Sequence, residues 1–330
     1  MAKRLALALA VLAALPAGAQ ARARFDTSVF ALIPRPGFPA MAYVGPNHRV
    51  YEGTYDNPAG DTMPSRVFEY SAGGALLRSW VIRGQDLSGA HGVQVGTMDP
   101  KRRLMLLDKS PPRVIRLERN SGRQKVYATF PAGAVPNYAA WGTDRALYVT
   151  DYEGATIWRV PPGGGKAEVW LKDAALDGGP FGLTGIRLAK DRHTFVVAMQ
   201  SQAGLGGGNP TAGRIVTIPI LETGKPGPIT PLWESSPFDG PDGFGIARSG
   251  TIYIALLLAN KIAVVNPDGT VMARASSPRF DSPSSVSFLG TRLMVANQSY
   301  VMGSAANQAI LDVEAGEPGL REFIPKRRKR

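Results

Sequence analysis

Cysteine is absent from this 330-residue chain, and histidine occurs only three times. The lack of cysteine excludes disulfide bonds, thiolate zinc sites, thiol nucleophiles and a lipid-modified cysteine anchor. Neither the Gly-x-Ser-x-Gly segment of many serine hydrolases nor the His-Glu-x-x-His segment of zinc proteases occurs. Any catalysis must therefore use other side chains, and the fold must rely on its apolar core alone.

Long apolar runs are also scarce, and the clearest one lies at the N-terminus. Lys3 and Arg4 precede an unbroken apolar run over residues 5–15, and Ala-Gly-Ala follows at residues 17–19. This order is typical of a secretory signal peptide, because the run is well short of the roughly 20 residues that a membrane span needs. We therefore predict a signal peptide over residues 1–21, with a retained anchor as the alternative. The mature protein is expected to be secreted or periplasmic, without an integral membrane segment.

Basic residues outnumber acidic ones, and the formal net charge is +12. Part of this excess lies in the predicted signal peptide, and residues 326–330 are five consecutive basic residues. Such a tail could contact an anionic surface, but no aromatic residue is interleaved with it for stacking on bases. We predict a solvated C-terminal tail over residues 326–330 and no nucleic-acid partner.

A diffuse unit recurs six times between residues 22 and 325. Each copy has a loop with Gly or Pro, a short apolar strand, a turn and a second strand, as in residues 136–149 and 241–254. Consecutive copies begin 42 to 58 residues apart, close to the roughly 40–50 residues of a four-stranded propeller blade. No segment has a long helical periodicity, and no linker divides the chain. The sequence predicts one all-β domain, a six-bladed β-propeller, in which residues 28–33 complete the last blade beside residues 320–324.

The first strand of each propeller blade lines the central channel, so equivalent positions at the strand starts form a ring at one mouth. Five of the six predicted ring residues have polar side chains ahead of apolar strands, whereas ordinary turn chemistry is the alternative explanation. The predicted ring consists of Ala40, His91, Asn137, Thr184, Asp242 and Ser284.

Two members of the predicted ring are titratable. Asp242 is its only carboxylate, and His91 is its only histidine, because His48 and His193 follow their inner strands and belong to the opposite end of the channel. Hard cations such as Ca²⁺ prefer carboxylate, amide and water oxygens. Asp242 and Asn137 are therefore the predicted metal ligands, although one carboxylate makes the site weak.

Three segments are similar to the gluconolactonase/regucalcin (senescence-marker) family and its paraoxonase and strictosidine-synthase-like relatives. They are Pro136-Asn137, Pro241-Asp242-Gly243 and Ala90-His91-Gly92-Val93. The resemblance implies a six-bladed propeller that binds calcium and hydrolyses lactones. It also implies that Asp242 is a metal ligand and general base, that Asn137 belongs to the substrate or metal site, and that His91 is an active-site histidine.

The chain departs from that family pattern in two blades. The segment around Ala40 has no glutamate where a first-blade ligand is expected, and Glu52 lies on the next strand, out of register. In the fourth blade, Thr184-Gly185 replaces the usual Asn-Gly. Part of the implied ligand set is thus missing or altered.

Three functions remain open on this basis. The first is a metal-assisted hydrolase of lactones or related cyclic esters, with Asp242 and His91 catalytic and Asn137, Thr184 and Ser284 at the substrate. The second is a non-catalytic extracytoplasmic propeller that binds a small ligand or a protein through a degenerate metal site. A synthase of the strictosidine type is third, because the ring lacks a glutamate base. We expect a monomer that acts on a small molecule.

Overall fold

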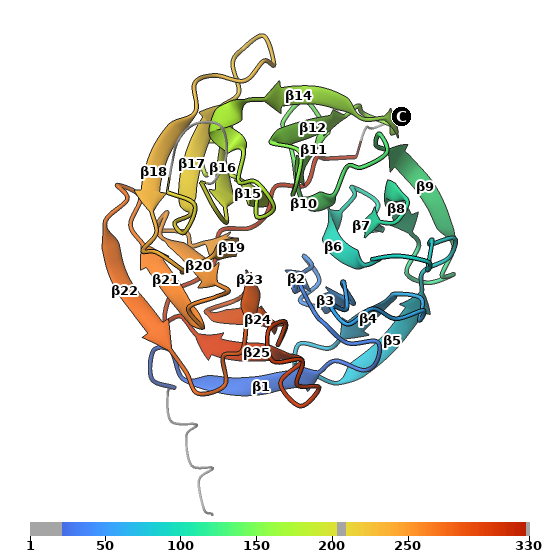
Figure 1. Ribbon diagram of the computed structural model, residues 1–330, viewed down its shortest axis with the longest axis horizontal. Helices are drawn as coiled ribbons and strands as arrows, with labels where there is room; N and C mark the ends of the chain where they lie inside the picture. The colour runs from blue at the N-terminus through green and yellow to red at the C-terminus, as the bar shows by residue number, and fades with distance from the viewer. Residues whose placement is uncertain (1–21, 203–208, 328–330) are drawn as a thin grey trace, which may run out of the picture.

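The computed structural model describes residues 22–202 and 209–327. These residues form six antiparallel sheets arranged as blades around a central channel (Figure 1). The prediction of an all-β, six-bladed β-propeller is therefore confirmed. The predicted signal peptide over residues 1–21 lies outside the described residues, as do the last three residues of the basic tail. Within the described ranges, no helix is long and apolar enough to cross a membrane.

Blades 1 to 3 follow one another along the chain. Blade 1 contains β2 (Tyr43–Val44), β3 (Val50–Gly53), β4 (Arg66–Tyr70) and β5 (Leu76–Val81). Blade 2 contains β6 (Val93–Met98), β7 (Leu104–Lys109), β8 (Pro112–Leu117) and β9 (Gln124–Thr129). Blade 3 contains β10 (Pro136–Trp141), β11 (Leu147–Asp151), β12 (Thr156–Val160) and β14 (Glu168–Lys172). The short β13 (Gly165–Lys166), between β12 and β14 in the chain, pairs in parallel with β9 and so joins the sheet of blade 2.

Blades 4 to 6 follow a single 3₁₀ turn, η1 (Ala174–Leu176). Blade 4 contains β15 (Leu183–Leu188), β16 (Thr194–Met199), β17 (Arg214–Pro219) and β18 (Thr230–Glu234). Blade 5 contains β19 (Pro241–Ile246), β20 (Ile252–Leu256), β21 (Lys261–Val265) and β22 (Val271–Ser276). Blade 6 contains β23 (Pro283–Leu289), β24 (Arg292–Asn297), β25 (Ala309–Glu314) and β1 (Thr27–Leu32).

The N-terminal strand β1 closes the ring as the outermost strand of blade 6. It pairs antiparallel with β25, with Thr27 opposite Val313 and Leu32 opposite Ala309. The prediction that residues 28–33 complete the last blade is confirmed, but the predicted partner, residues 320–324, is wrong. Residues 318–324 instead cross the end of the channel opposite the predicted ring, where Leu320 N–H donates to the carbonyl of Ile246.

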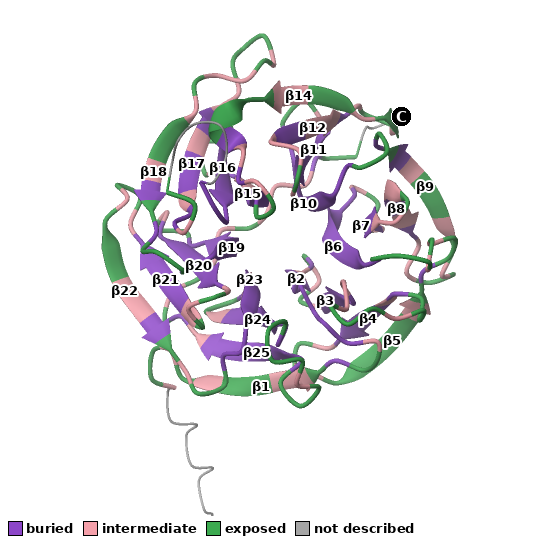
Figure 2. Ribbon diagram, viewed as in Figure 1, coloured by how far each residue is buried: buried purple, intermediate pink, exposed green. Residues whose placement is uncertain are grey.

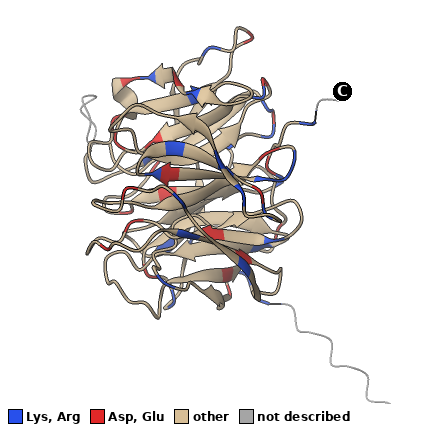
Figure 3. Cartoon of the chain, turned by 90° about the vertical axis from the view of Figure 1, so that its right-hand side faces the viewer, with Lys and Arg blue, Asp and Glu red and all other residues tan. Residues whose placement is uncertain are grey.

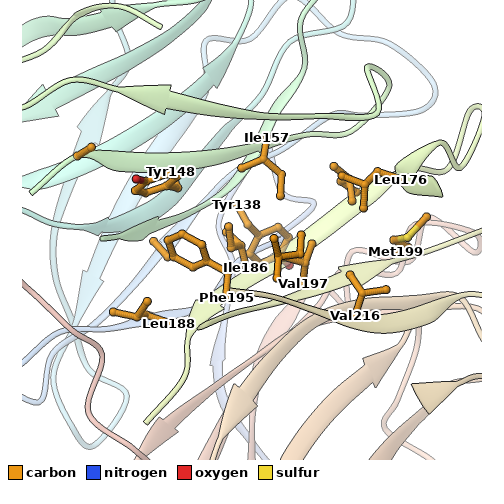
Figure 4. Packing of buried hydrophobic residues seen from close by; sticks show 14 of the residues in the cluster. Tyr138, Tyr148, Ile157, Leu176, Ile186, Leu188, Phe195, Val197, Met199 and Val216 are labelled. Atoms are coloured by element: carbon orange, nitrogen blue, oxygen red, sulfur yellow. The ribbon is translucent and has the colours of Figure 1, made fainter. Parts of the chain in front are cut away.

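The blades are held together by apolar side chains packed between neighbouring sheets. The inner strands β6, β10 and β19 are buried throughout, whereas the outer strands such as β5 are largely exposed (Figure 2). Between blades 3 and 4, the rings of Tyr148 and Phe195 lie 4.7 Å apart, within a cluster that includes Ile186 and Tyr138 (Figure 4). Because both faces of a blade are covered by its neighbours, the inner strands are mostly apolar, and their few polar residues include those at the channel.

Charged side chains are spread over the blades rather than gathered on one. In the side view of Figure 3, acidic and basic residues alternate along the visible strands and loops. Several are paired, such as Arg113 with the buried Asp108 and Arg119 with the buried Glu69.

Candidate site at the channel mouth

One backbone hydrogen bond recurs in all six blades and fixes the register of the mouth. The residue at or after the end of the second strand donates its N–H to a carbonyl at the start of the first strand, over 2.9–3.0 Å. The six accepting carbonyls belong to Phe38, Gly92, Val135, Gly182, Gly240 and Ser282. Two residues further on, the equivalent ring positions are Ala40, Gln94, Asn137, Thr184, Asp242 and Ser284.

The structure thus brings five of the six predicted ring residues into register and replaces one. In blade 2 the ring position is occupied by Gln94, whereas His91 lies three residues earlier, in the loop that enters the strand. Gln94 is buried, and its Oε1 has no hydrogen-bond partner among the described residues. Counting back from the second strand gives Gln94, whereas the repeat copy that begins at His91-Gly92-Val93 starts in the loop.

His91 joins two loops and is poorly suited to accept a proton. Its Nδ1 lies 2.9 Å from the carbonyl oxygen of Gly89, and its Nε2 lies 2.8 Å from that of Met63. Burial opposes a charge on the ring, but the two carbonyls and the Asp61 carboxylate outweigh it and raise the pKa of His91. Because both nitrogens face acceptors, the ring is held as a double donor. A general base needs a free lone pair, so the predicted catalytic role of His91 finds no support in this geometry.

Three ring side chains are bonded to the backbone of the next blade. Asn137 Nδ2 donates to the carbonyl of Leu183 over 3.4 Å, and Thr184 Oγ1 donates to that of Asp242 over 3.3 Å. Ser284 Oγ donates to the carbonyl of Ala40 over 3.0 Å. These bonds join the inner strands to one another, so Thr184 and Ser284 have structural roles that do not require a substrate.

Tyr138 crosses the channel just below the ring. It follows Asn137 on blade 3, and its hydroxyl donates a 2.9 Å hydrogen bond to the carbonyl of Ser284 on blade 6. Gly243 leaves room for it, because a Cβ at that position would lie 2.3 Å from the Tyr138 hydroxyl oxygen. The glycine of the Pro-Asp-Gly segment is therefore needed for the close approach of this tyrosine.

Asp242 lies at the mouth with its carboxyl group removed from most of the solvent. The residue is 9% exposed. Burial raises the pKa of Asp242 to about 8, although the Tyr138 hydroxyl and the Gly243 N–H partly oppose the shift. Tyr55 and Tyr152 are close enough for the Asp242 charge to raise their pKa values further, beyond the effect of their own burial. The carboxyl group thus sits among tyrosines at the floor of the mouth.

Glu52 is a second buried carboxyl group at the mouth, although its place on the second strand is out of register with the ring. It lies on β3, yet its Oε1 accepts the N–H of Met41 over 3.0 Å, and its Oε2 has no partner among the described residues. Burial raises the pKa of Glu52 to about 8, against the effect of the backbone N–H groups of Met41, Gly53 and Ala40. The long side chain therefore brings an acid to the first blade, beside the ring position where Ala40 supplies none.

The oxygen donors of the mouth fit a hard cation in type but include few charges. Asp242 provides the carboxylate, and the amide oxygens of Asn137 and Gln94 are neutral donors of the kind that Ca²⁺ accepts. Gln94 Oε1 is buried without a partner, which is the clearest unmet acceptor at the ring. Across residues 22–202 and 209–327, however, no three His, Asp or Glu side chains group closely enough to hold a metal. Any cation here would be bound weakly.

Comparison with known proteins gives likenesses of structure. No family model matches the chain, and no curated protein matches its sequence. Among solved structures, the chain is similar to a calcium-binding regucalcin from Agrobacterium tumefaciens, with 17% identity and a TM-score of 0.65 over 92% of this chain and 98% of that one. The chain shares the fold of the gluconolactonase and regucalcin proteins.

The same fold carries other activities. A gluconolactonase from Xanthomonas campestris matches with 15% identity and a TM-score of 0.55, over 88% of this chain and 96% of that one. A virginiamycin B lyase from Staphylococcus aureus matches with 14% identity and a TM-score of 0.57, over 88% of this chain and 99% of that one. At these identities the gluconolactonase-like fold is established, and the activity has to be argued from the site.

Proposed function

We propose that this chain is a hydrolase of lactones or related cyclic esters, with Asp242 as the general base at the channel mouth. The observation that carries the proposal is the state of this carboxyl group. It is the only carboxyl at the six ring positions, it is 9% exposed, and burial raises its pKa to about 8. A base whose pKa lies near the working pH is both available in its ionised form and strong enough to take a proton.

The reaction follows from that single group. The Asp242 carboxylate accepts a proton from a water molecule whose oxygen bonds to the carbonyl carbon of the cyclic ester. When the ring C–O bond breaks, the proton on Asp242 passes to the departing alkoxide oxygen, which leaves an open-chain hydroxy acid. Tyr138 holds the base from below, because its hydroxyl stabilises the ionised form and its ring closes the channel under the substrate.

A calcium ion would fit beside this base. Asp242 with the amide oxygens of Asn137 and Gln94 would hold it, and it would polarise the substrate carbonyl when bound. Asn137 is already oriented for such a role, because its Nδ2 is directed at the carbonyl of Leu183. Export is part of the same proposal, and it rests on the signal-like pattern of residues 1–21.

A non-catalytic binding propeller is the second candidate, and the loops of the mouth favour it. Two kinds of loop emerge on the face that carries the ring: those between blades, and those between the second and third strands of a blade. Exposed apolar side chains lie in these loops. They are Phe181, Phe238, Leu258, Val301 and Met302. Such a rim could bind a partner without turnover. If the protein is a hydrolase, the same rim would favour esters with an apolar portion.

The two candidates are separated by initial rates on a panel of γ- and δ-lactones, measured with and without calcium. Hydrolysis that depends on Asp242, tested as Asp242→Asn, supports the hydrolase. Glu168→Gln is the control, because it also replaces a carboxyl by an amide, at an exposed position outside the ring. The absence of turnover on every lactone, together with saturable binding of the same compounds, would support the binding propeller instead.

A further inference from the structure

The end of the channel opposite the ring contains a partly open cavity, lined by polar and apolar groups, that the proposed function does not use. Its volume is about 260 Å³, and it is lined by the far ends of the inner strands and by residues 318–324. Tyr138 lies between this cavity and the mouth, because the cavity wall begins at Ala140, two residues further along β10. The two ends of the channel are therefore separate compartments.

Residues 318–324 form a strap along one side of this cavity. Gly319 N–H donates to the carbonyl of Gly290 over 3.1 Å, and Arg248 N–H donates to that of Pro318 over 2.9 Å, which anchors the strap on blades 5 and 6. Phe323 then packs against the cores between blades 2, 3 and 4. Figure 1 shows this last stretch of the described chain crossing behind the ring towards the mark C. The strap is thus a fixed wall of the cavity.

Polar groups with unmet hydrogen-bonding capacity face this cavity. Tyr43 is 2% exposed, and its hydroxyl has no hydrogen-bond partner among the described residues. Oε1 of Glu322, on the strap, likewise has no hydrogen bond of normal geometry to the described residues, although the Glu322 carboxyl and the Tyr43 hydroxyl lie close enough to shift each other's pKa. A buried hydroxyl or carboxyl without a partner is costly in a finished fold, and a ligand is one way to satisfy it.

Arg187 supplies a positive charge to the same cavity without a direct ion pair among the described residues, and Glu322 is the acid that its charge influences. Its guanidinium is half-buried, and the hydrogen bond found for it is to the carbonyl of Ile186 over 3.2 Å. No ion pair involving Arg187 occurs within the part of the chain that the structure describes. Burial raises the pKa of Glu322 and of Tyr43. The nearby charge of Arg187 partly opposes this shift in both groups.

Further positive charge surrounds the cavity, and its remaining walls are apolar. Arg248 and Arg321 line it from exposed positions, which raises the local concentration of anions. Trp141, Val286 and Phe288 provide the apolar surface. A carboxylate would accept hydrogen bonds from the Arg187 guanidinium and the Tyr43 hydroxyl, while an attached apolar group would pack on these side chains.

We propose that this cavity is a second ligand site, distinct from the mouth, for a small carboxylate with an apolar body. The volume of about 260 Å³ limits the ligand to a small molecule, below the usual range of drug-sized pockets. Arg187 is its principal anchor and Tyr43 its second donor. The site does not depend on the proposed lactone hydrolysis.

Calorimetric titration of the full chain with benzoate tests the proposal, with benzamide as the neutral isostere. We expect saturable binding of benzoate and an affinity for benzamide that is at least about tenfold weaker, as a lost charge-assisted hydrogen bond requires. Arg187→Gln should lower the affinity for benzoate by about 10- to 100-fold. Tyr43→Phe should weaken it about three- to tenfold while keeping the melting temperature, because the hydroxyl it removes has no partner in the free protein.

The mouth variant Asp242→Asn serves as the control for location and should bind benzoate as the wild type does. Three results would overturn the proposal: no saturation below about 10 mM benzoate, equal affinity for benzamide, or unchanged affinity in a folded Arg187→Gln protein. Loss of benzoate binding in Asp242→Asn would place the ligand at the mouth instead and would also overturn it. Failure of lactone hydrolysis leaves these results unaffected.

Discussion

The hydroxyl of Tyr138 on blade 3 donates a 2.9 Å hydrogen bond to the carbonyl of Ser284 on blade 6, across the central channel. This contact divides the channel into a mouth that contains Asp242 and a lower cavity beneath residues 318–324. It also ties two blades that are opposite each other in the ring. The tyrosine therefore affects both the stability of the propeller and the acidity of the carboxyl group beside it.

Tyr138→Phe should lower the stability by about 1 kcal/mol, because a buried hydrogen bond is lost. It should also raise the apparent pKa of Asp242, since the hydroxyl now favours the ionised carboxylate. Chemical denaturation measures the first effect and the pH dependence of lactone hydrolysis the second. Tyr148→Phe is the control, because it removes a tyrosine hydroxyl that bonds Asp144, far along the strand from the mouth. An identical pH profile in Tyr138→Phe and wild type would contradict the effect of the Tyr138 hydroxyl on the pKa of Asp242.

We expect the wild-type protein to lose stability as the pH rises, and Glu52→Gln should remove much of that loss. Burial raises the pKa of Glu52 from 4.5 to about 8, so the native state holds a proton that the unfolded chain releases. This contribution is complete below about pH 4.5, declines as the pH rises, and is lost above pH 8. At pH 8 the variant should be more stable than the wild type by about 2 kcal/mol or more.

The measurement for Glu52 is the free energy of unfolding at several pH values between 5 and 9. Glu168→Gln provides the control, because that side chain is 67% exposed and should leave the pH dependence as it is. A wild-type stability that rises between pH 5 and pH 8, or parallel curves for Glu52→Gln and wild type, would show that Glu52 is not held protonated.

His91→Gln should reduce stability while sparing turnover. The imidazole joins the loops of Met63 and Gly89, and a shorter-reaching amide cannot bond both carbonyls as well. We expect a melting temperature lower by several degrees and a kcat within about tenfold of wild type, since general-base loss typically costs more than about 100-fold. A kcat reduced by that larger factor, with an unchanged melting temperature, would restore His91 to the catalytic group.

Calcium should stabilise the wild-type protein weakly and only through the mouth. A ligand that binds the native state raises the melting temperature with its concentration. We expect a saturable rise at millimolar calcium, because one carboxylate contributes to the site. The rise should vanish in Asp242→Asn and persist in Thr184→Val, whose hydroxyl is engaged with the backbone of the next blade. A response that survives Asp242→Asn would locate the cation elsewhere.

The repeating pattern of the sequence was sufficient for the fold and for most of the ring. Five ring positions, four of them polar, followed from the residues ahead of the apolar strands, because blade register is a local property of each hairpin. Gln94 was missed because the repeat pattern of blade 2 begins at His91, which lies in the loop three residues before the ring position.

The contacts that define the two compartments could not be derived from sequence spacing. Tyr138 reaches Ser284 over 146 positions of the chain, and Glu52 reaches the ring by the direction of its side chain rather than by its place on the strand. The path of residues 318–324 under the channel depends on apolar packing of Phe323 against blades far away in the sequence. Such tertiary contacts override the local pattern from which the strands were predicted.

The most direct test of the proposed function is kcat/KM for lactone hydrolysis as a function of pH, in wild type and Asp242→Asn. With Asp242 as the base, the wild-type rate should rise with pH and level off above about 8, where the carboxyl is ionised. The variant should lose about 100-fold or more and show no such inflection. A variant that retains the wild-type rate and profile would contradict the assignment of Asp242 as the base, and a wild-type protein without lactone turnover would contradict the hydrolase.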